Sequence, residues 1–130
     1  MTIDSYAARL AREQRDYRLC EDIHELSPIF HYWSNTFIRP QMESLGFSSS
    51  TDLFRQTLAR IISGDERAGR GEKSSPRAFL SLGSGNCDIE IQIASELVQA
   101  GHSGFTIECL DVNAEMLERG QEAASRQGVL

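Results

Sequence analysis

Apolar residues recur at helical spacing through the first half of the chain and predict three helices. The first has one apolar face, made of Ile3, Tyr6, Ala7, Leu10 and Tyr17. A second helix is expected to begin at Ser27-Pro28, because serine is a favoured N-cap and proline fits the first helical position. Pro40 should kink or restart this helix, and Gly46 should end it.

The third helix is expected directly after a run of serines. Ser49 and Asp52 have the spacing of a capping box, in which each side chain bonds a backbone N–H near the other. Apolar residues then line one face, namely Phe54, Leu58, Ile61 and Ile62. Gly64 is expected to end this helix by adopting a left-handed conformation.

A change in composition follows the third helix. From Gly64 to Arg77 the chain reads GDERAGRGEKSSPR, which offers almost nothing apolar to bury. We therefore predict a helical segment over residues 1–63, a flexible linker over 64–77 and a separate unit over 78–130.

Strand and helix patterns alternate in the last of these segments. The predicted elements are a strand over 78–82, a helix that ends near Gly101, a strand over 105–110 and a helix from Asn113 to near Gly128. The first strand, AFLSL, is typical of strands buried on both faces of a parallel sheet. This βαβα order predicts an α/β fold.

The turn after the first strand carries the candidate chemistry. Gly83 and Gly85 have no Cβ, so a ligand can approach the backbone closely, and the next helix offers free N–H groups at its start. Asp111 ends the neighbouring strand, where its carboxylate can accept hydrogen bonds from both hydroxyls of a ribose. Together they predict a nucleoside-containing cofactor at the carboxyl edge of the sheet.

Other glycine-containing motifs fit this region less well. A dinucleotide fingerprint needs a small residue where Asp88 stands, and that carboxylate would repel a pyrophosphate. A P-loop needs Lys-Ser or Lys-Thr where the chain has Arg70-Gly71, and Gly83-Ser84-Gly85 is not the G-x-S-x-G of a nucleophile elbow. An NAD(P)-dependent oxidoreductase is thus the weaker alternative.

Composition narrows the class further. The 130 residues include 13 Lys plus Arg and 19 Asp plus Glu, and this net charge of −6 argues against nucleic acid as a partner. No apolar run approaches the roughly 20 residues that span a bilayer, so no membrane partner is expected. The three cysteines form no CxxC pair and suggest reduced thiols in a cytoplasmic protein. Cys20 and His24, one helical turn apart, are too few for a metal site.

Two stretches of the second half resemble the class I S-adenosylmethionine-dependent methyltransferases. Motif I of that family is similar to FLSLGSGNCDIE, with Gly83 and Gly85 at its first two glycines. Motif II is similar to FTIECLDVNAEMLERG, with Asp111 at the ribose acid. A segment that precedes this domain in some bacterial members resembles HYWSNTFIRP, residues 31–40.

The resemblance implies an incomplete Rossmann-like fold that uses S-adenosyl-L-methionine as cofactor. The residues it assigns are Gly83, Ser84 and Gly85 beside the methionine moiety, Asp111 on the ribose, and Val112 and Asn113 beside the adenine. The implied reaction transfers a methyl group from a sulfonium donor to an acceptor, which we expect to be a small molecule, and the protein mainly binds, aligns and excludes water. No catalytic base can be named, since acceptor residues usually follow the fourth strand.

Two residues depart from the family pattern. Ser81 stands where the family usually has an acid, so a contact to the cofactor's ammonium group is expected to weaken. Cys87 stands where a third glycine is common, and we expect its small side chain to be tolerated.

Other notable residues have simpler explanations. The aromatic run His31, Tyr32 and Trp33 is interpreted as core packing, with a place beside the cofactor or acceptor pocket as the alternative. Asp88 and Glu90 are interpreted as charges favoured at a helix N-terminus rather than as an acid/base pair.

Only two of the seven strands of the family fold are legible. Two parallel strands cannot bury both faces or satisfy their edges alone. We therefore expect the chain to be the N-terminal part of a longer methyltransferase, which would self-associate through its open sheet edge if it exists alone. The alternative from another class is a non-catalytic remnant, a helical interaction module attached to an incomplete cofactor fold.

Overall fold

A computed structural model describes residues 5–18, 27–67 and 76–130. The chain divides into two compact units, Met1–Gln41 and Met42–Leu130. The expected pair Cys20 and His24 and most of the expected linker lie outside the described residues. Among the described residues, no helix combines the length and the apolar character that a membrane crossing requires.

The second predicted helix begins where the sequence predicts. The helices of the first half are α1 (Tyr6–Arg18), α2 (Pro28–Trp33), the π-helical turn η1 (Ser34–Ile38) and α3 (Arg39–Ser44). Ser27 has extended backbone and Pro28 occupies the first turn of α2, as expected. Pro40 has no N–H to donate to the preceding turn, and the helix widens into η1 directly before α3. Gly46, with a φ of +87°, follows the end of α3 as predicted.

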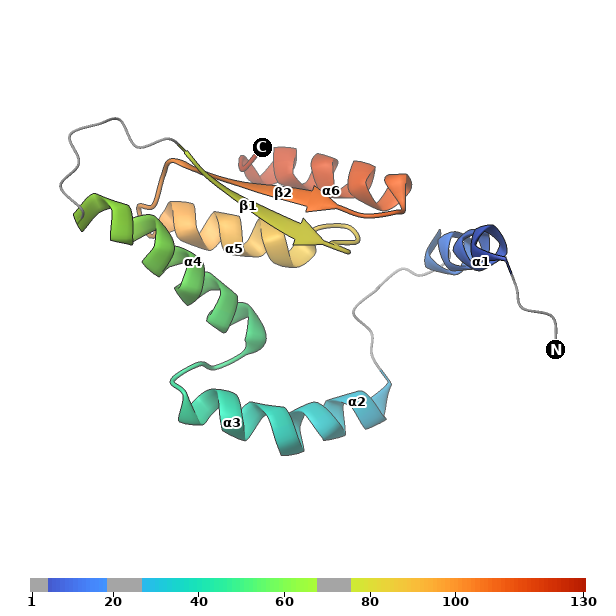
Figure 1. Cartoon of the computed structure of the whole chain (residues 1–130), viewed down its shortest axis with the longest axis horizontal. Helices are drawn as coiled ribbons and strands as arrows, with labels where there is room; N and C mark the ends of the chain where they lie inside the picture. The colour runs from blue at the N-terminus through green and yellow to red at the C-terminus, as the bar shows by residue number, and fades with distance from the viewer. Residues whose placement is uncertain (1–4, 19–26, 68–75) are drawn as a thin grey trace. The chain divides into compact units, whose positions relative to one another are not determined.

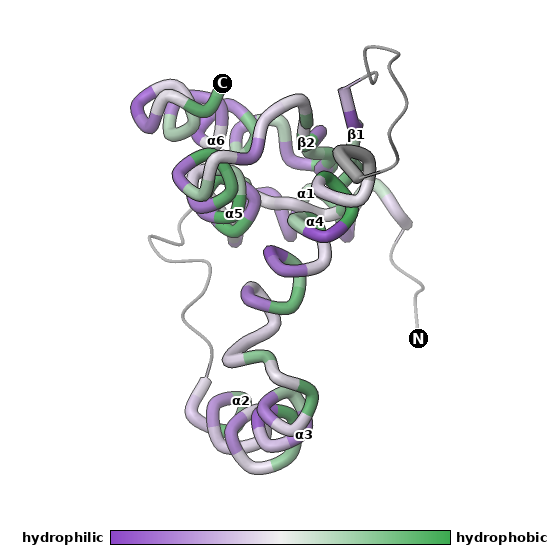
Figure 2. Tube along the Cα trace, turned by 90° about the vertical axis from the view of Figure 1, so that its left-hand side faces the viewer, coloured by the Kyte–Doolittle hydropathy of each residue, from purple (hydrophilic) through white to green (hydrophobic). Residues whose placement is uncertain are grey.

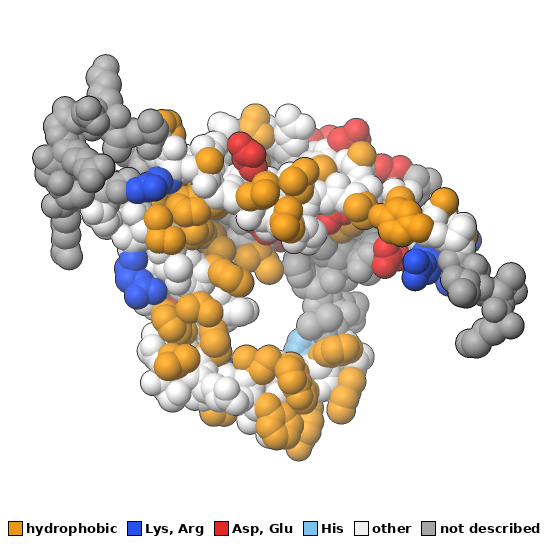
Figure 3. Space-filling view, viewed as in Figure 1, with side chains coloured by type: hydrophobic (Ala, Val, Ile, Leu, Met, Phe, Trp, Pro, Cys, Tyr) orange, Lys and Arg blue, Asp and Glu red, His pale blue; other side chains and the backbone are white. Residues whose placement is uncertain are grey.

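The interpretation of the aromatic run as core packing is wrong for the described chain. Tyr32 is 63% exposed and Trp33 is 51% exposed. No residue of α2, η1 or α3 is buried, and hydrophobic side chains gather on the surface of these helices (Figure 3). Helical spacing identified an apolar face correctly, but spacing alone does not show what covers that face.

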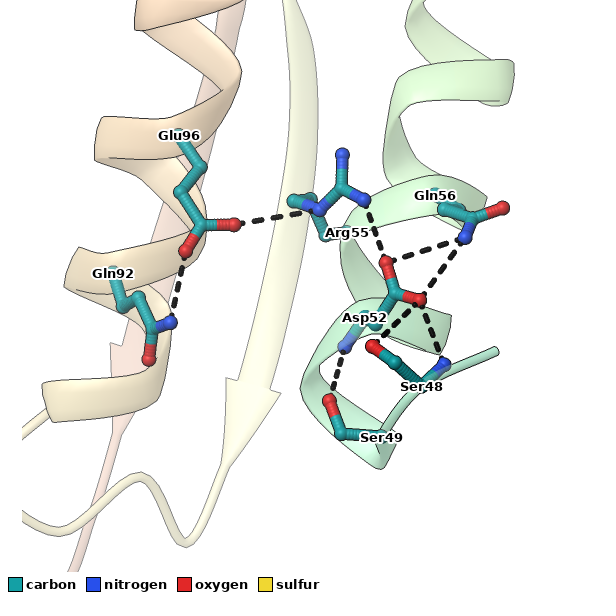
Figure 4. Close-up of polar contacts among 7 residues, drawn as sticks. All are labelled: Ser48, Ser49, Asp52, Arg55, Gln56, Gln92 and Glu96. Atoms are coloured by element: carbon teal, nitrogen blue, oxygen red, sulfur yellow. Dashed lines mark hydrogen bonds and ion pairs between the residues drawn. The ribbon is translucent and has the colours of Figure 1, made fainter. Parts of the chain in front are cut away.

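The second unit opens with α4 (Ser50–Arg67), which begins with the predicted cap. The N–H of Asp52 donates to Ser49 Oγ at 3.1 Å. The Asp52 carboxylate reaches back to the N–H of Ser48, at 2.9 Å, one residue earlier than in a standard capping box (Figure 4). The predicted end at Gly64 is wrong, because α4 continues to Arg67. A glycine inside a helix costs only about 1 kcal/mol, so a single glycine does not by itself end a helix.

The rest of the unit has the predicted βαβα order. The elements are β1 (Arg77–Leu82), α5 (Asp88–Gln99), β2 (Phe105–Leu110) and α6 (Ala114–Gln127). The strands are parallel and pair from Arg77 opposite Phe105 to Leu82 opposite Leu110 (Figure 1). This is the incomplete Rossmann-like fold that the sequence predicts.

The core lies on one face of this sheet. Ile62 of α4 packs with Ile93 and Leu97 of α5, and Leu97 is only 1% exposed. Partly buried residues surround them, namely Leu58, Ala59, Phe79, Phe105 and Ile107. The coloured trace shows α5 with apolar and polar stretches alternating along its turns (Figure 2). Packing of α4 and α5 therefore fixes the sheet from one side.

The opposite face of the sheet is exposed, which corrects the expectation of burial on both faces. Leu80, Leu82 and Leu110 are 56%, 74% and 51% exposed. Successive side chains of a strand point to opposite faces, so Phe79 lies in the core while its neighbour Leu80 does not. The apolar composition of β1 is typical of a strand with helices on both faces of its sheet. Among the described residues, helices cover only the face that contains Phe79.

A polar cluster joins α4 to α5. Arg55 bonds Asp52 of its own helix at 2.6 Å and Glu96 of α5 at 3.3 Å (Figure 4). The backbone N–H of Ser48 and the side chains of Arg55 and Gln56 lower the pKa of Asp52 to about 2. These partners favour the charged carboxylate, so Asp52 stabilises the folded state when it is ionised.

We predict that Asp52→Asn destabilises the protein near neutral pH and that this effect disappears in acid. The pKa of Asp52 is lower in the folded chain than its ordinary value of 3.8. The stabilisation is therefore complete above about pH 5 and is lost as the pH falls towards about 2. Urea denaturation of both proteins across this range measures the difference.

The control is Glu122→Gln, which removes an exposed carboxylate 3.9 Å from Arg126 on α6. Its effect should be small, because pairs of exposed charges contribute little. A destabilisation by Asp52→Asn that stays constant down to about pH 2 would contradict the assignment.

Candidate functional site

The turn after β1 has an unusual backbone conformation. Gly83 and Gly85 have φ values of +71° and +55°, in the left-handed region that glycine tolerates. The N–H groups of Gly83 and Ser84 donate to the carbonyl of Leu110 at 2.7 and 3.3 Å. The turn thus closes over the carboxyl end of β2 as well as β1. A Cβ built on Gly83 would meet nothing within 4 Å, so there is open space beside this residue.

Asp111 binds this turn directly. Its Oδ2 accepts the N–H of Gly85 at 2.8 Å, and its Oδ1 accepts the N–H of Asn113 at 2.8 Å. A carboxylate has about four acceptor positions, so capacity remains for further donors such as sugar hydroxyls. The structure therefore brings together the glycine turn and the strand-end acid that the sequence selected.

The residues after Asp111 differ in their exposure. Val112 is 63% exposed, so its side chain is available to a ligand. Asn113 is 7% exposed at the N-cap of α6, where its side chain makes no capping bond. Of the two residues expected beside the adenine, Val112 offers a side chain and Asn113 lies buried behind it.

The structure explains why a third glycine is common at the position of Cys87. Cys87 has a φ of +61° and is the described non-glycine residue with a positive φ. A left-handed conformation costs a residue with a Cβ roughly 1–2 kcal/mol. The constraint at this position is therefore backbone conformation, whereas the sequence argument considered only close approach. The chain accepts this strain while the thiol is buried at 6% exposure.

Two residues that the sequence argument did not select contact this turn. A Cβ on Gly120 of α6 would lie 2.8 Å from the Asn86 carbonyl oxygen and 3.0 Å from Cys87 Sγ. The available signal was an isolated glycine within a helical pattern. Asn86 donates to Asp88 at 2.7 Å, but its buried Oδ1 has no partner among the described residues. Such an acceptor would gain most from a donor on a ligand.

Cys109 is a structural rather than a reactive cysteine. Burial raises the pKa of the Cys109 thiol to about 12, and the adjacent Cys87 side chain adds to this shift. A thiol that stays protonated is neither a nucleophile nor a metal ligand. In the described parts of the chain, no group of three His, Cys, Asp or Glu side chains is placed to hold a metal ion.

A pocket of about 730 Å³ lies between α5, β2 and α6. Cys87, Cys109 and Glu90 contribute to its lining, together with apolar residues such as Ile91 and Leu117. Neither Gly83 nor Asp111 lines it. The turn after β1 therefore contributes Cys87 to this lining but not its glycines.

The parallel βαβα unit and its acid-bound glycine turn define the class, an incomplete Rossmann-like α/β protein. The sequence profile of the ubiE/COQ5 methyltransferase family matches residues 33–130. The chain therefore belongs to this family of class I S-adenosylmethionine-dependent methyltransferases. The match includes both motifs and most of the segment 31–40. Comparison with curated proteins and with solved structures yields no match.

We predict that Gly120→Ala destabilises the protein by about 1–3 kcal/mol, because the new methyl group would overlap the backbone of the glycine turn. Chemical denaturation measures this loss. Gly64→Ala is the matched control, since a Cβ there meets nothing within 4 Å and the residue is helical. It should stabilise the protein by about 0.4–1 kcal/mol. Equal effects of the two changes would contradict the close approach of α6 to the turn.

Proposed function

We propose that the chain binds S-adenosyl-L-methionine at the carboxyl edge of β1 and β2, with Gly83, Ser84 and Gly85 on one side and Asp111 on the other. The observation that carries the proposal is the 2.8 Å hydrogen bond from Gly85 N–H to Asp111, which joins the two motifs into one site. Membership of a methyltransferase family supports the choice of cofactor.

The residues present fit such a cofactor. Open space beside Gly83 leaves room for a ligand against the backbone. Asp111 retains acceptor capacity for two ribose hydroxyls, and exposed Val112 beside it provides an apolar contact for a base.

When bound, the cofactor supplies a methyl group activated on a sulfonium centre. The protein then acts mainly by positioning the reactants. Binding aligns the donor and the acceptor, so their translational and rotational entropy is lost before the reaction step. The turn fixes one end of the cofactor and Asp111 fixes its ribose. We propose a small-molecule acceptor, and the net charge of −6 supports this choice over nucleic acid.

We also propose that the chain is part of a longer methyltransferase. The exposed leucine face of the sheet supports this proposal, because an apolar face of a parallel sheet is normally covered by helices. If the chain occurs alone, self-association through the open edge of the sheet would follow from the unpaired backbone groups there.

We predict that Asp111→Ala weakens binding of S-adenosylhomocysteine at least about tenfold, because it removes charge-assisted hydrogen bonds to the ribose. Isothermal titration calorimetry on the 130-residue chain measures the affinity. Glu108→Ala is the matched control, since it removes an exposed carboxylate from the same strand and should leave the affinity unchanged.

A thermal melt of each variant separates lost binding from lost folding, because Asp111 also accepts two backbone N–H groups. If the folded wild-type chain gives no heat with S-adenosylhomocysteine, the non-catalytic alternative is favoured. Equal affinity of the wild type and Asp111→Ala would exclude the assigned role of Asp111.

A further inference from the structure

A second carboxylate lies at the base of the glycine turn. The hydroxyl of Ser81 donates to Glu90 Oε1 at 2.5 Å. Ser81 is near the end of β1 and Glu90 is in the first turn of α5. Both side chains are half-buried. The hydrogen bond therefore connects the end of β1 to the start of α5. The turn between them contains Gly83, Ser84 and Gly85, which the proposed function places on the cofactor.

The backbone of the turn needs such support. Gly83, Gly85 and Cys87 all have left-handed conformations. This conformation is strained for Cys87, because Cys87 has a Cβ. Sparsely populated conformations persist where surrounding contacts determine them more than once. Asp111 holds the turn to β2 through Gly85, while the Ser81–Glu90 bond sets the separation between β1 and α5.

The other acid in the first turn of α5 does not make this connection. Asp88 bonds Asn86 at 2.7 Å, a contact within the turn itself. Attraction to the helix dipole accounts for an acid at either position but not for a specific bond to the strand. Glu90 is thus distinguished by its partner on β1.

We propose that Glu90 is a positioning residue for the cofactor turn. Acting through Ser81, its carboxylate holds the start of α5 against the end of β1 and so fixes the turn in a binding-competent conformation. This inference rests on the proposed function for its effect on binding, but the effect on the turn itself is measurable without any ligand.

Amide hydrogen exchange of the 130-residue chain tests the effect on the turn. The relevant N–H groups are those of Gly83, Ser84, Gly85 and Cys87, each of which has an acceptor in the structure. Ser81→Ala and Glu90→Ala should each accelerate their exchange about tenfold, with little change in the strands, because a hydrogen bond to a charged group is lost. Gln92→Ala is the control on α5, since its side chain contacts Glu96 and not the turn.

Two rescue variants separate positioning from general structural support. Glu90→Gln keeps a carbonyl oxygen that can accept the Ser81 hydroxyl, so the turn should stay protected. Ser81→Glu alone places two carboxylates face to face and should accelerate exchange. Combining Ser81→Glu with Glu90→Ser restores one carboxylate and one hydroxyl with the same total reach, and protection should return.

The outcomes for the turn and for binding are distinguishable. Unchanged exchange in Ser81→Ala and Glu90→Ala, acceleration spread evenly over both strands, or no recovery in the exchanged pair would each overturn the proposal. Affinity for S-adenosylhomocysteine should fall about tenfold in the two alanine variants, because a disordered turn must be ordered on binding. Absence of binding by the wild type would count against the proposed function and would leave the exchange result to decide the role of Glu90.

Discussion

The candidate site depends on one hydrogen bond, in which the carboxylate of Asp111 holds the backbone N–H of Gly85. This contact links the end of the second strand to the turn that follows the first. The turn would otherwise be a short loop with several residues in left-handed conformations. A hydrogen bond from an amide to a carboxylate is stronger than one between neutral groups. Here it holds a turn that lies outside the regular hydrogen bonding of β1 and α5.

Packing of the helices also restrains the position of the turn. Buried Ile62, Ile93 and Leu97 press α4 and α5 onto one face of the sheet, which fixes where α5 begins. Helix α6 also approaches the turn, and a Cβ on Gly120 would lie only 2.8 Å from the Asn86 carbonyl oxygen. The position of the turn is therefore determined by β2, by the packing of α4, α5 and α6, and by Asp111.

Features with a local cause were predicted correctly from the sequence. The start of α2 at Pro28, the cap of α4 at Ser49 and the glycine after α6 each follow from backbone chemistry within a few residues. Proximity of the glycine turn to Asp111 was expected for a different reason, because parallel strands bring their carboxyl ends to one edge, and in the structure Asp111 bonds Gly85.

Features that depend on packing were not predictable in this way. Gly64 lies inside α4, because a single glycine can be tolerated within a helix as well as end one. The space requirement at Gly120 comes from Asn86 and Cys87, which belong to a different part of the fold. Exposure of Trp33 could not be inferred from periodicity, which identifies a face but not its cover.

The contacts that fix the glycine turn lie close together in the sequence. The Ser81–Glu90 bond, the Gly85–Asp111 bond and the close approach of Gly120 all come from one continuous stretch, residues 81–120. Methyl transfer requires that the donor be held rigidly, because alignment accounts for much of the rate. A donor site encoded in one βαβα unit can keep its geometry while the acceptor side varies. In the proposed function, the left-handed Cys87 and the carboxylates of Glu90 and Asp111 would together fix the turn that binds the donor.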